Sequence, residues 1–151
     1  FPPTILATPS LEERDVRGAN CLHCAAEAGE LQALKELLRR GCRADVVDDQ
    51  GCSILHYAAA GGRVDVVKHC VKTLRINSSV QDSDGDTPLI VAAFEGHAEV
   101  VQWLLQNGSS LDERNNEGMS PVLAAAAGEN PDVIEVVNNW NGSDGMCWMQ
   151  E

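Results

Sequence analysis

The stretch DSDGDTPLIVAAFEGHAEVVQWLLQNG, residues 82–108, decides the fold. Thr87 can cap a helix with its hydroxyl, and Pro88 suits a first helical position, where no backbone N–H is needed. Gly96 can end that helix in a left-handed conformation. A second helix with apolar residues at helical spacing is predicted to follow directly and to end at Gly108. The stretch therefore predicts a pair of short antiparallel helices.

The same unit recurs along the chain. Four glycines open equivalent segments at intervals of 33, 34 and 33 residues, and each is followed at the same offset by a pair of alanines. The glycines are Gly18, Gly51, Gly85 and Gly118, and the alanine pairs begin at Ala25, Ala58, Ala92 and Ala125. Small residues at this offset allow neighbouring inner helices to approach closely. Because one helix pair cannot bury both of its apolar faces, the repeats are predicted to stack around one continuous core.

The repeated unit resembles the ankyrin repeat family. The resemblance rests on Asp82-x-x-Gly85-x-Thr87-Pro88-Leu89, Gly96-His97, Leu22-His23 and Leu55-His56. It implies an all-α solenoid of stacked helix-turn-helix units joined by β-hairpin-like loops. It does not imply a particular partner, because one such scaffold serves many unrelated functions.

The array is predicted over residues 14–140, with repeats at about 14–47, 48–80, 81–113 and 114–140. Residues 1–13 contain three prolines and no helical period, so they form either a linker or a cap over the first repeat. Residues 141–151 are a tail that packs on the last repeat, begins a further repeat or ends flexibly.

Repeat two departs from the family pattern. Leu74 replaces the glycine that ends the repeat in the family, and one residue is inserted before Gly85. This change predicts a longer second helix or a looser loop.

Neither a metal nor a cofactor is expected. Cys21-Leu-His-Cys24 resembles half of a zinc site, but no second pair follows at a suitable spacing. Residues 82–86 carry three aspartates but lack the spacing of a calcium-binding EF-hand loop. Five of the six cysteines occupy repeat positions that normally hold small or apolar residues, which favours a reducing compartment, the cytoplasm with the nucleus as the alternative.

The sequence predicts a binding protein and no enzyme. It contains no nucleophile elbow, zinc-protease helix, phosphate loop or dinucleotide fingerprint. The family resemblance implies a non-catalytic protein-protein interaction module, a scaffold that binds a partner protein or peptide through a concave groove. A targeting or autoinhibitory domain of a larger enzyme or signalling protein is the alternative, and a structural spacer is a third interpretation.

The groove residues follow from the family's variable concave positions, carried over one at a time. They are Arg14, Arg17, Glu27, Asp49, Gln50, Asp84, Asp86, Phe94, Glu95, Arg114, Glu117 and Met119. Phe94 and Met119 are the predicted anchors, because aromatic residues and methionine are enriched at interface cores. The alternative for Phe94 is that it fills space between neighbouring helices.

Charge is distributed unevenly along the chain. Residues 1–75 carry ten basic and ten acidic side chains, net zero, whereas residues 76–151 carry one basic and thirteen acidic, net −12. Either this acidic half only aids solubility, or it attracts a partner with a basic patch. Such a surface repels nucleic acid and anionic membranes, and no apolar run is long enough for membrane insertion. The array is expected to be a monomer.

Overall fold

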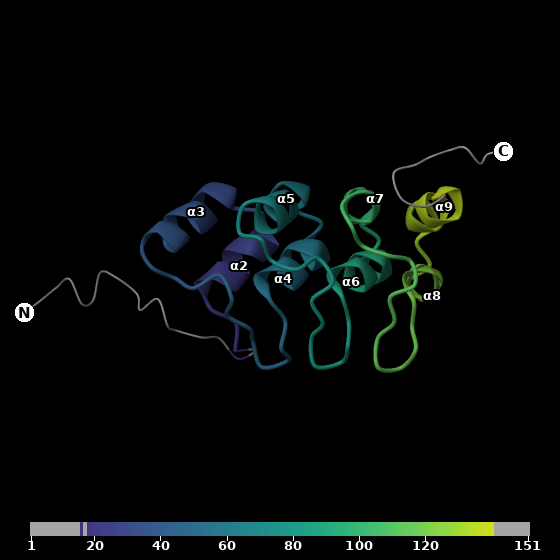
Figure 1. The fold of residues 1–151 in the computed structure, drawn as a ribbon, viewed down its shortest axis with the longest axis horizontal. Helices are drawn as coiled ribbons and strands as arrows, with labels where there is room; N and C mark the ends of the chain where they lie inside the picture. Colours follow the sequence, from purple (N-terminus) through teal and green to yellow (C-terminus); the bar gives the residue numbers. More distant parts are fainter. Residues whose placement is uncertain (1–15, 17, 141–151) are drawn as a thin grey trace, which may run out of the picture.

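The computed structural model describes residues 16 and 18–140, which form eight α-helices in four antiparallel pairs (Figure 1). The inner helices are α2 (Cys21–Ala28), α4 (Ile54–Gly61), α6 (Pro88–Glu95) and α8 (Pro121–Ala127). The outer helices are α3 (Leu31–Arg39), α5 (Val64–Lys72), α7 (Ala98–Gln106) and α9 (Pro131–Asn139). Each set forms its own row, and hairpin-like loops extend from the inner row. No strand occurs in the described part, so the predicted all-α solenoid is confirmed.

Local signals fix the ends of α6 as the sequence predicts. The Thr87 hydroxyl accepts a hydrogen bond from the backbone N–H of Ile90 at 3.3 Å, and Pro88 occupies the first helical position. Gly96 ends the helix with φ of 86°, in the left-handed region.

The core is a continuous layer between the two rows of helices. Leu22, Leu55 and Leu89 occupy the same position of successive inner helices and are fully buried. The alanine pairs that begin at Ala58 and Ala92 are fully buried too, which allows the inner helices to pack closely. Small side chains thus bring the inner row together, as the sequence predicts.

Histidines link successive repeats through loop carbonyls. His23 Nε2 lies 3.1 Å from the carbonyl oxygen of Cys52, and His56 Nε2 lies 2.7 Å from that of Asp86. Both rings are buried, so each bond satisfies a polar group that has left water. His23 and His56 therefore have a structural role between the repeats.

The insertion in repeat two lies in a loop. Helix α5 has nine residues, as do α3 and α7, so the alternative of a longer second helix is wrong. The chain turns directly after α5, where Arg75 has φ of 59°. The extra residue is therefore absorbed between α5 and the next loop. None of the described helices has the length and apolar character needed to cross a bilayer.

Candidate functional site

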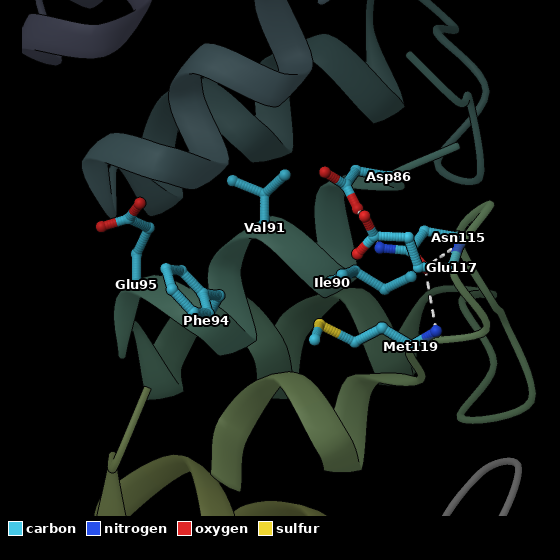
Figure 2. A pocket seen from close by; sticks show the side chains of 8 residues that line it. All are labelled: Asp86, Ile90, Val91, Phe94, Glu95, Asn115, Glu117 and Met119. Carbon is cyan, nitrogen blue, oxygen red and sulfur yellow. Dashed lines mark hydrogen bonds between the residues drawn. The ribbon is translucent and has the colours of Figure 1, made fainter. Parts of the chain in front are cut away.

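A hollow of about 270 Å³ lies between inner helix α6 and the loop that leads to α8 (Figure 2). It is lined by Asp86, Ile90, Val91, Phe94, Glu95, Asn115, Glu117 and Met119. Two repeats contribute to it, so the hollow exists only because repeats three and four are stacked.

The floor of the hollow is apolar. Ile90 is 2% exposed and Met119 is half-buried, whereas Phe94 on the last turn of α6 is 48% exposed. Phe94 is one of the few large apolar side chains that the described residues leave open to solvent. The interpretation of Phe94 as mere filling between helices fits this exposure poorly, because a filling side chain would be covered.

Carboxylates occupy both ends of the hollow. Glu95 lies beside Phe94 at the C-terminal end of α6, while Asp86 and Glu117 lie at the opposite end with Asn115 (Figure 2). A ligand in the hollow would therefore contact an apolar centre between two acidic ends.

Asp86 is held in place by two neighbours. Its Oδ1 accepts a hydrogen bond of 2.8 Å from Asn115 Nδ2, and its backbone carbonyl bonds to His56. Burial raises the pKa of the Asp86 carboxyl above its ordinary value. The Asn115 hydrogen bond opposes this shift, whereas the charges of Asp82 and Asp84 add to it. A cation placed at Asp86 would relieve this accumulation of negative charge.

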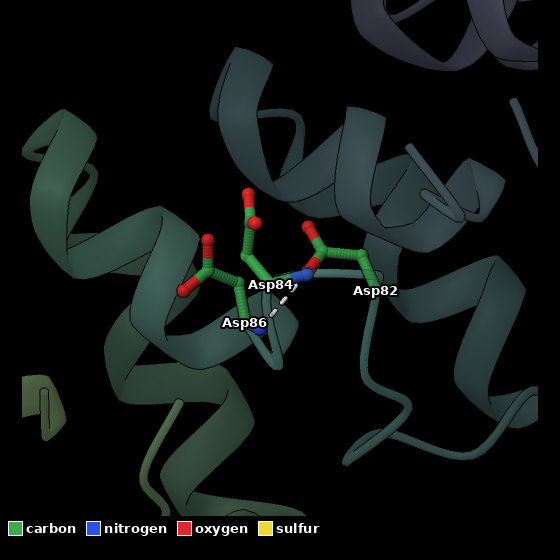
Figure 3. A group of neighbouring side chains, drawn as sticks. All are labelled: Asp82, Asp84 and Asp86. Carbon is green, nitrogen blue, oxygen red and sulfur yellow. Dashed lines mark hydrogen bonds between the residues drawn. The ribbon is translucent and has the colours of Figure 1, made fainter. Parts of the chain in front are cut away.

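Three aspartates of the preceding loop lie close together. Asp82, Asp84 and Asp86 each have a carboxylate oxygen within 4.8 Å of the others (Figure 3). Asp82 Oδ1 accepts hydrogen bonds of 2.9 Å from the backbone N–H groups of Asp84 and Asp86. Asn115 makes the same pair of backbone bonds in repeat four without a charge. The Asp82 carboxylate therefore shapes the loop, and the cluster adds negative potential beside the hollow.

Few cations are available nearby. Arg114 is the one lysine or arginine in residues 76–140, and it does not line the hollow. Its guanidinium donates a hydrogen bond of 3.2 Å to the backbone carbonyl of Glu113. The carboxylates of the hollow are thus not paired with basic side chains of the repeats that carry them.

The structure brings five of the predicted site residues together in the hollow. These are Asp86, Phe94, Glu95, Glu117 and Met119. Asp84 lies in the adjoining loop. The other predicted groove residues that the structure describes lie outside the hollow. They are Glu27, Asp49, Gln50 and Arg114. Arg14 and Arg17 are outside the described residues.

Three lining residues were not predicted from the sequence. Ile90 and Val91 belong to the inner helix, and Asn115 to the loop of repeat four. A signal for Ile90 existed, because the equivalent positions in repeats one and two hold His23 and His56. A change from histidine to an apolar residue marks a junction with different contacts.

Comparison with known proteins agrees with this architecture. A family model described as ankyrin repeats (3 copies) matches residues 5–72 and 68–144. Transient receptor potential cation channel subfamily A member 1 from Homo sapiens is 28% identical over 127 residues, 84% of this chain and 11% of the channel. The channel of the same name from Drosophila melanogaster is 32% identical over 117 residues, 75% of this chain and 10% of the channel.

A fungal protein shows a similar degree of likeness. Ankyrin repeat protein nuc-2 from Neurospora crassa is 28% identical over 123 residues, 82% of this chain and 12% of that protein. The chain thus spans about a tenth of the length of these curated relatives.

Proposed function

Because the chain belongs to the ankyrin repeat family, we propose that it is a non-catalytic module that binds a partner protein or peptide in its concave groove. The observation that carries this proposal is the hollow between α6 and the loop of repeat four. It combines an exposed aromatic side chain, Phe94, with an apolar floor and carboxylates at both ends. Aromatic residues and methionine are enriched in the cores of interfaces, and a few such anchors carry most of the binding energy.

The chemistry of the hollow indicates a partner with an apolar side chain flanked by lysine or arginine. The apolar residue would pack against Phe94 and Met119, and the flanking cations would lie near Glu95 and near Asp86. Opposite charges at the rim accelerate encounter and exclude wrong partners more than they add affinity. Phe94 and Met119 therefore supply most of the affinity, and the carboxylates supply selectivity.

A role within a larger protein is the second candidate. The matched residues make up 10–12% of each relative, so the matched repeats form one part of each of them. By analogy, the array serves as the targeting or autoinhibitory domain of a larger signalling protein or enzyme. Its groove would then accept a basic segment of the same protein or of a cytoplasmic or nuclear partner, with the array itself remaining monomeric.

The test uses short synthetic peptides. One set contains a single Leu, Met or Phe flanked by Lys or Arg, and the matched set carries Glu in place of the basic residues. Fluorescence anisotropy should show binding of the basic set and none of the acidic set. The double variant E95Q/E117Q should weaken binding, whereas E99Q/E135Q on the outer helices, with the same change in net charge, should not. Equal effects of the two variants would mean that net charge, and not the hollow, attracts the peptides.

A further inference from the structure

Two thiols of the first repeat lie close together. The Sγ atoms of Cys21 and Cys42 are 4.0 Å apart, although the residues are 21 positions apart in sequence. Cys21 is the first residue of α2, and Cys42 lies in the loop after α3. Helices α2 and α3 lie at one end of the two rows of helices (Figure 1). Both are half-buried, so small molecules in solution can reach them.

Other cysteines of the array have surroundings that suppress reactivity. Cys70 is fully buried in the core, and burial raises its pKa to about 12. Burial also raises the pKa of Cys52, and the nearby carboxylates of Asp48 and Asp82 raise it further. The thiolate is the reactive form of cysteine, so neither of these residues reacts readily near neutral pH.

Cys24 is the nearest rival partner for Cys21. It is exposed and lies three residues further along α2. Helical residues at this spacing have Cβ atoms about 5–6 Å apart, whereas a disulfide needs about 3.5–4.5 Å. A bond between Cys21 and Cys24 would therefore distort the first turn of α2, which is held by a capping box of Asn20 and His23.

We propose that Cys21 and Cys42 are a reversible dithiol–disulfide pair that responds to low-molecular-weight disulfides such as oxidised glutathione. The sulfurs must approach by about 2 Å to reach the bonded distance of about 2.05 Å. Rotation of the two side chains, with a small shift of the loop that carries Gly41 and Cys42, would supply this approach.

The reaction is two successive thiol–disulfide exchanges. The thiolate of one cysteine attacks a sulfur of oxidised glutathione, forms a mixed disulfide and releases one glutathione thiolate. The thiolate of the second cysteine then attacks the protein sulfur of the mixed disulfide and releases the second glutathione. The two cysteines together lose two protons and two electrons, and one glutathione disulfide becomes two glutathione thiols.

Closure of this bond would secure the helix that has the fewest buried residues among the described helices. Helix α3 has a single fully buried residue, Leu34, whereas the equivalent helix α7 has four buried residues. An element with few buried apolar side chains opens at a low cost in free energy. A covalent link from the loop after α3 to the start of α2 holds the outer helix where packing holds it least.

The experiment is a redox titration of the whole chain. The protein is equilibrated in mixtures of oxidised and reduced glutathione, quenched by alkylation and mapped by peptide mass spectrometry. Cys21 and Cys42 should lose alkylation together and regain it in dithiothreitol. Thermal unfolding of the oxidised form should shift upward by about 5 °C.

Three variants separate the alternatives. Cys24→Ser should behave as wild type. Cys42→Ser and Cys21→Ser should give a glutathione adduct on the remaining cysteine of the pair in place of the internal disulfide. The proposal is wrong if the wild-type disulfide contains Cys24 or Cys147, if glutathione adducts accumulate without an internal bond, or if no thiol is lost over the whole titration.

Discussion

Phe94 and Leu89 lie five residues apart on α6, but truncation of Leu89 should reduce stability, whereas truncation of Phe94 should reduce peptide binding. Leu89 is fully buried, whereas Phe94 is 48% exposed. Replacing each with alanine removes an apolar side chain of similar character from the same helix. We expect Leu89→Ala to reduce stability strongly, and Phe94→Ala to reduce binding of a basic-apolar peptide while leaving folding nearly intact.

The magnitudes follow from burial. Leu89→Ala removes about three methylene equivalents at about 0.8 kcal/mol each, and the cavity left behind adds to this loss, giving about 2 to 5 kcal/mol in total. A fully buried Phe→Ala change costs about 3 to 5 kcal/mol, so the half-exposed Phe94 should cost below about 2 kcal/mol. As a binding anchor, Phe94 should contribute about 2 kcal/mol, which corresponds to a loss of affinity of about 30-fold.

Urea unfolding followed by far-UV circular dichroism measures the loss of free energy of unfolding. Fluorescence anisotropy of a labelled peptide, on the same preparations, measures the loss of affinity. Because repeat arrays can unfold in stages, the slope with denaturant must match between variants before free energies are compared. If Phe94→Ala lowers the free energy of unfolding as much as Leu89→Ala, Phe94 is a core residue. If it leaves peptide affinity unchanged, Phe94 is not the anchor.

Gly85 and Gly118 both have φ near 80°, but a Cβ at Gly85 would stand 2.7 Å from the backbone N of Asn116, while none of the described atoms lies within 4 Å at Gly118. Gly118→Ala should therefore cost about 1–2 kcal/mol in urea unfolding and Gly85→Ala clearly more; equal costs would contradict the inter-repeat contact. Burial lowers the pKa of His56 below 6.5, so the unfolded chain is protonated first and stability should fall as pH drops below about 6.5. His56→Asn should flatten that part of the pH profile, and an unchanged slope would show that other groups cause it. The association rate with a basic peptide should fall as salt rises, since screening acts over about 8 Å at physiological ionic strength, and a flat rate in stopped-flow mixing would exclude electrostatic steering.

The sequence predicts the parts of this fold that local chemistry decides. Thr87, Pro88 and Gly96 determine the ends of α6 through groups within a few residues of each other, so they could be read without knowledge of the rest of the chain. The stacking could be predicted as well, because the spacing of glycines and alanines repeats along the chain. Both kinds of signal are local or periodic.

The hollow could be predicted only in part, because its shape depends on contacts between repeats. Phe94 and Met119 were predicted because they occupy variable concave positions of the family. Asn115 could be identified only from the structure, through its bond to Asp86, 29 residues away. The length of α5 could not be predicted from the sequence either, because it too depends on contacts with the next repeat. An inserted residue can extend a helix or lengthen a loop, and packing of the next repeat makes the choice.

The hollow lies where the array departs from its own pattern. At the third position of the inner helix, repeats one and two carry a histidine that bonds to a carbonyl of the next loop. Repeat three carries Ile90 there, which cannot make such a bond and instead provides the floor of the hollow. The junction with repeat four keeps the backbone bond that the junction between repeats two and three also has: the N–H of Asn116 donates to the carbonyl of Asp84 at 2.9 Å. In addition, Asn115 Nδ2 donates to the Asp86 carboxylate at 2.8 Å. The change to Ile90 thus removes a buried polar bond and creates apolar surface, while the bond from Asn115 fixes the Asp86 carboxylate at the edge of the hollow. The combination of apolar floor and oriented negative charge arises from a single altered junction, which explains why the structure places it between repeats three and four and not between repeats one and two.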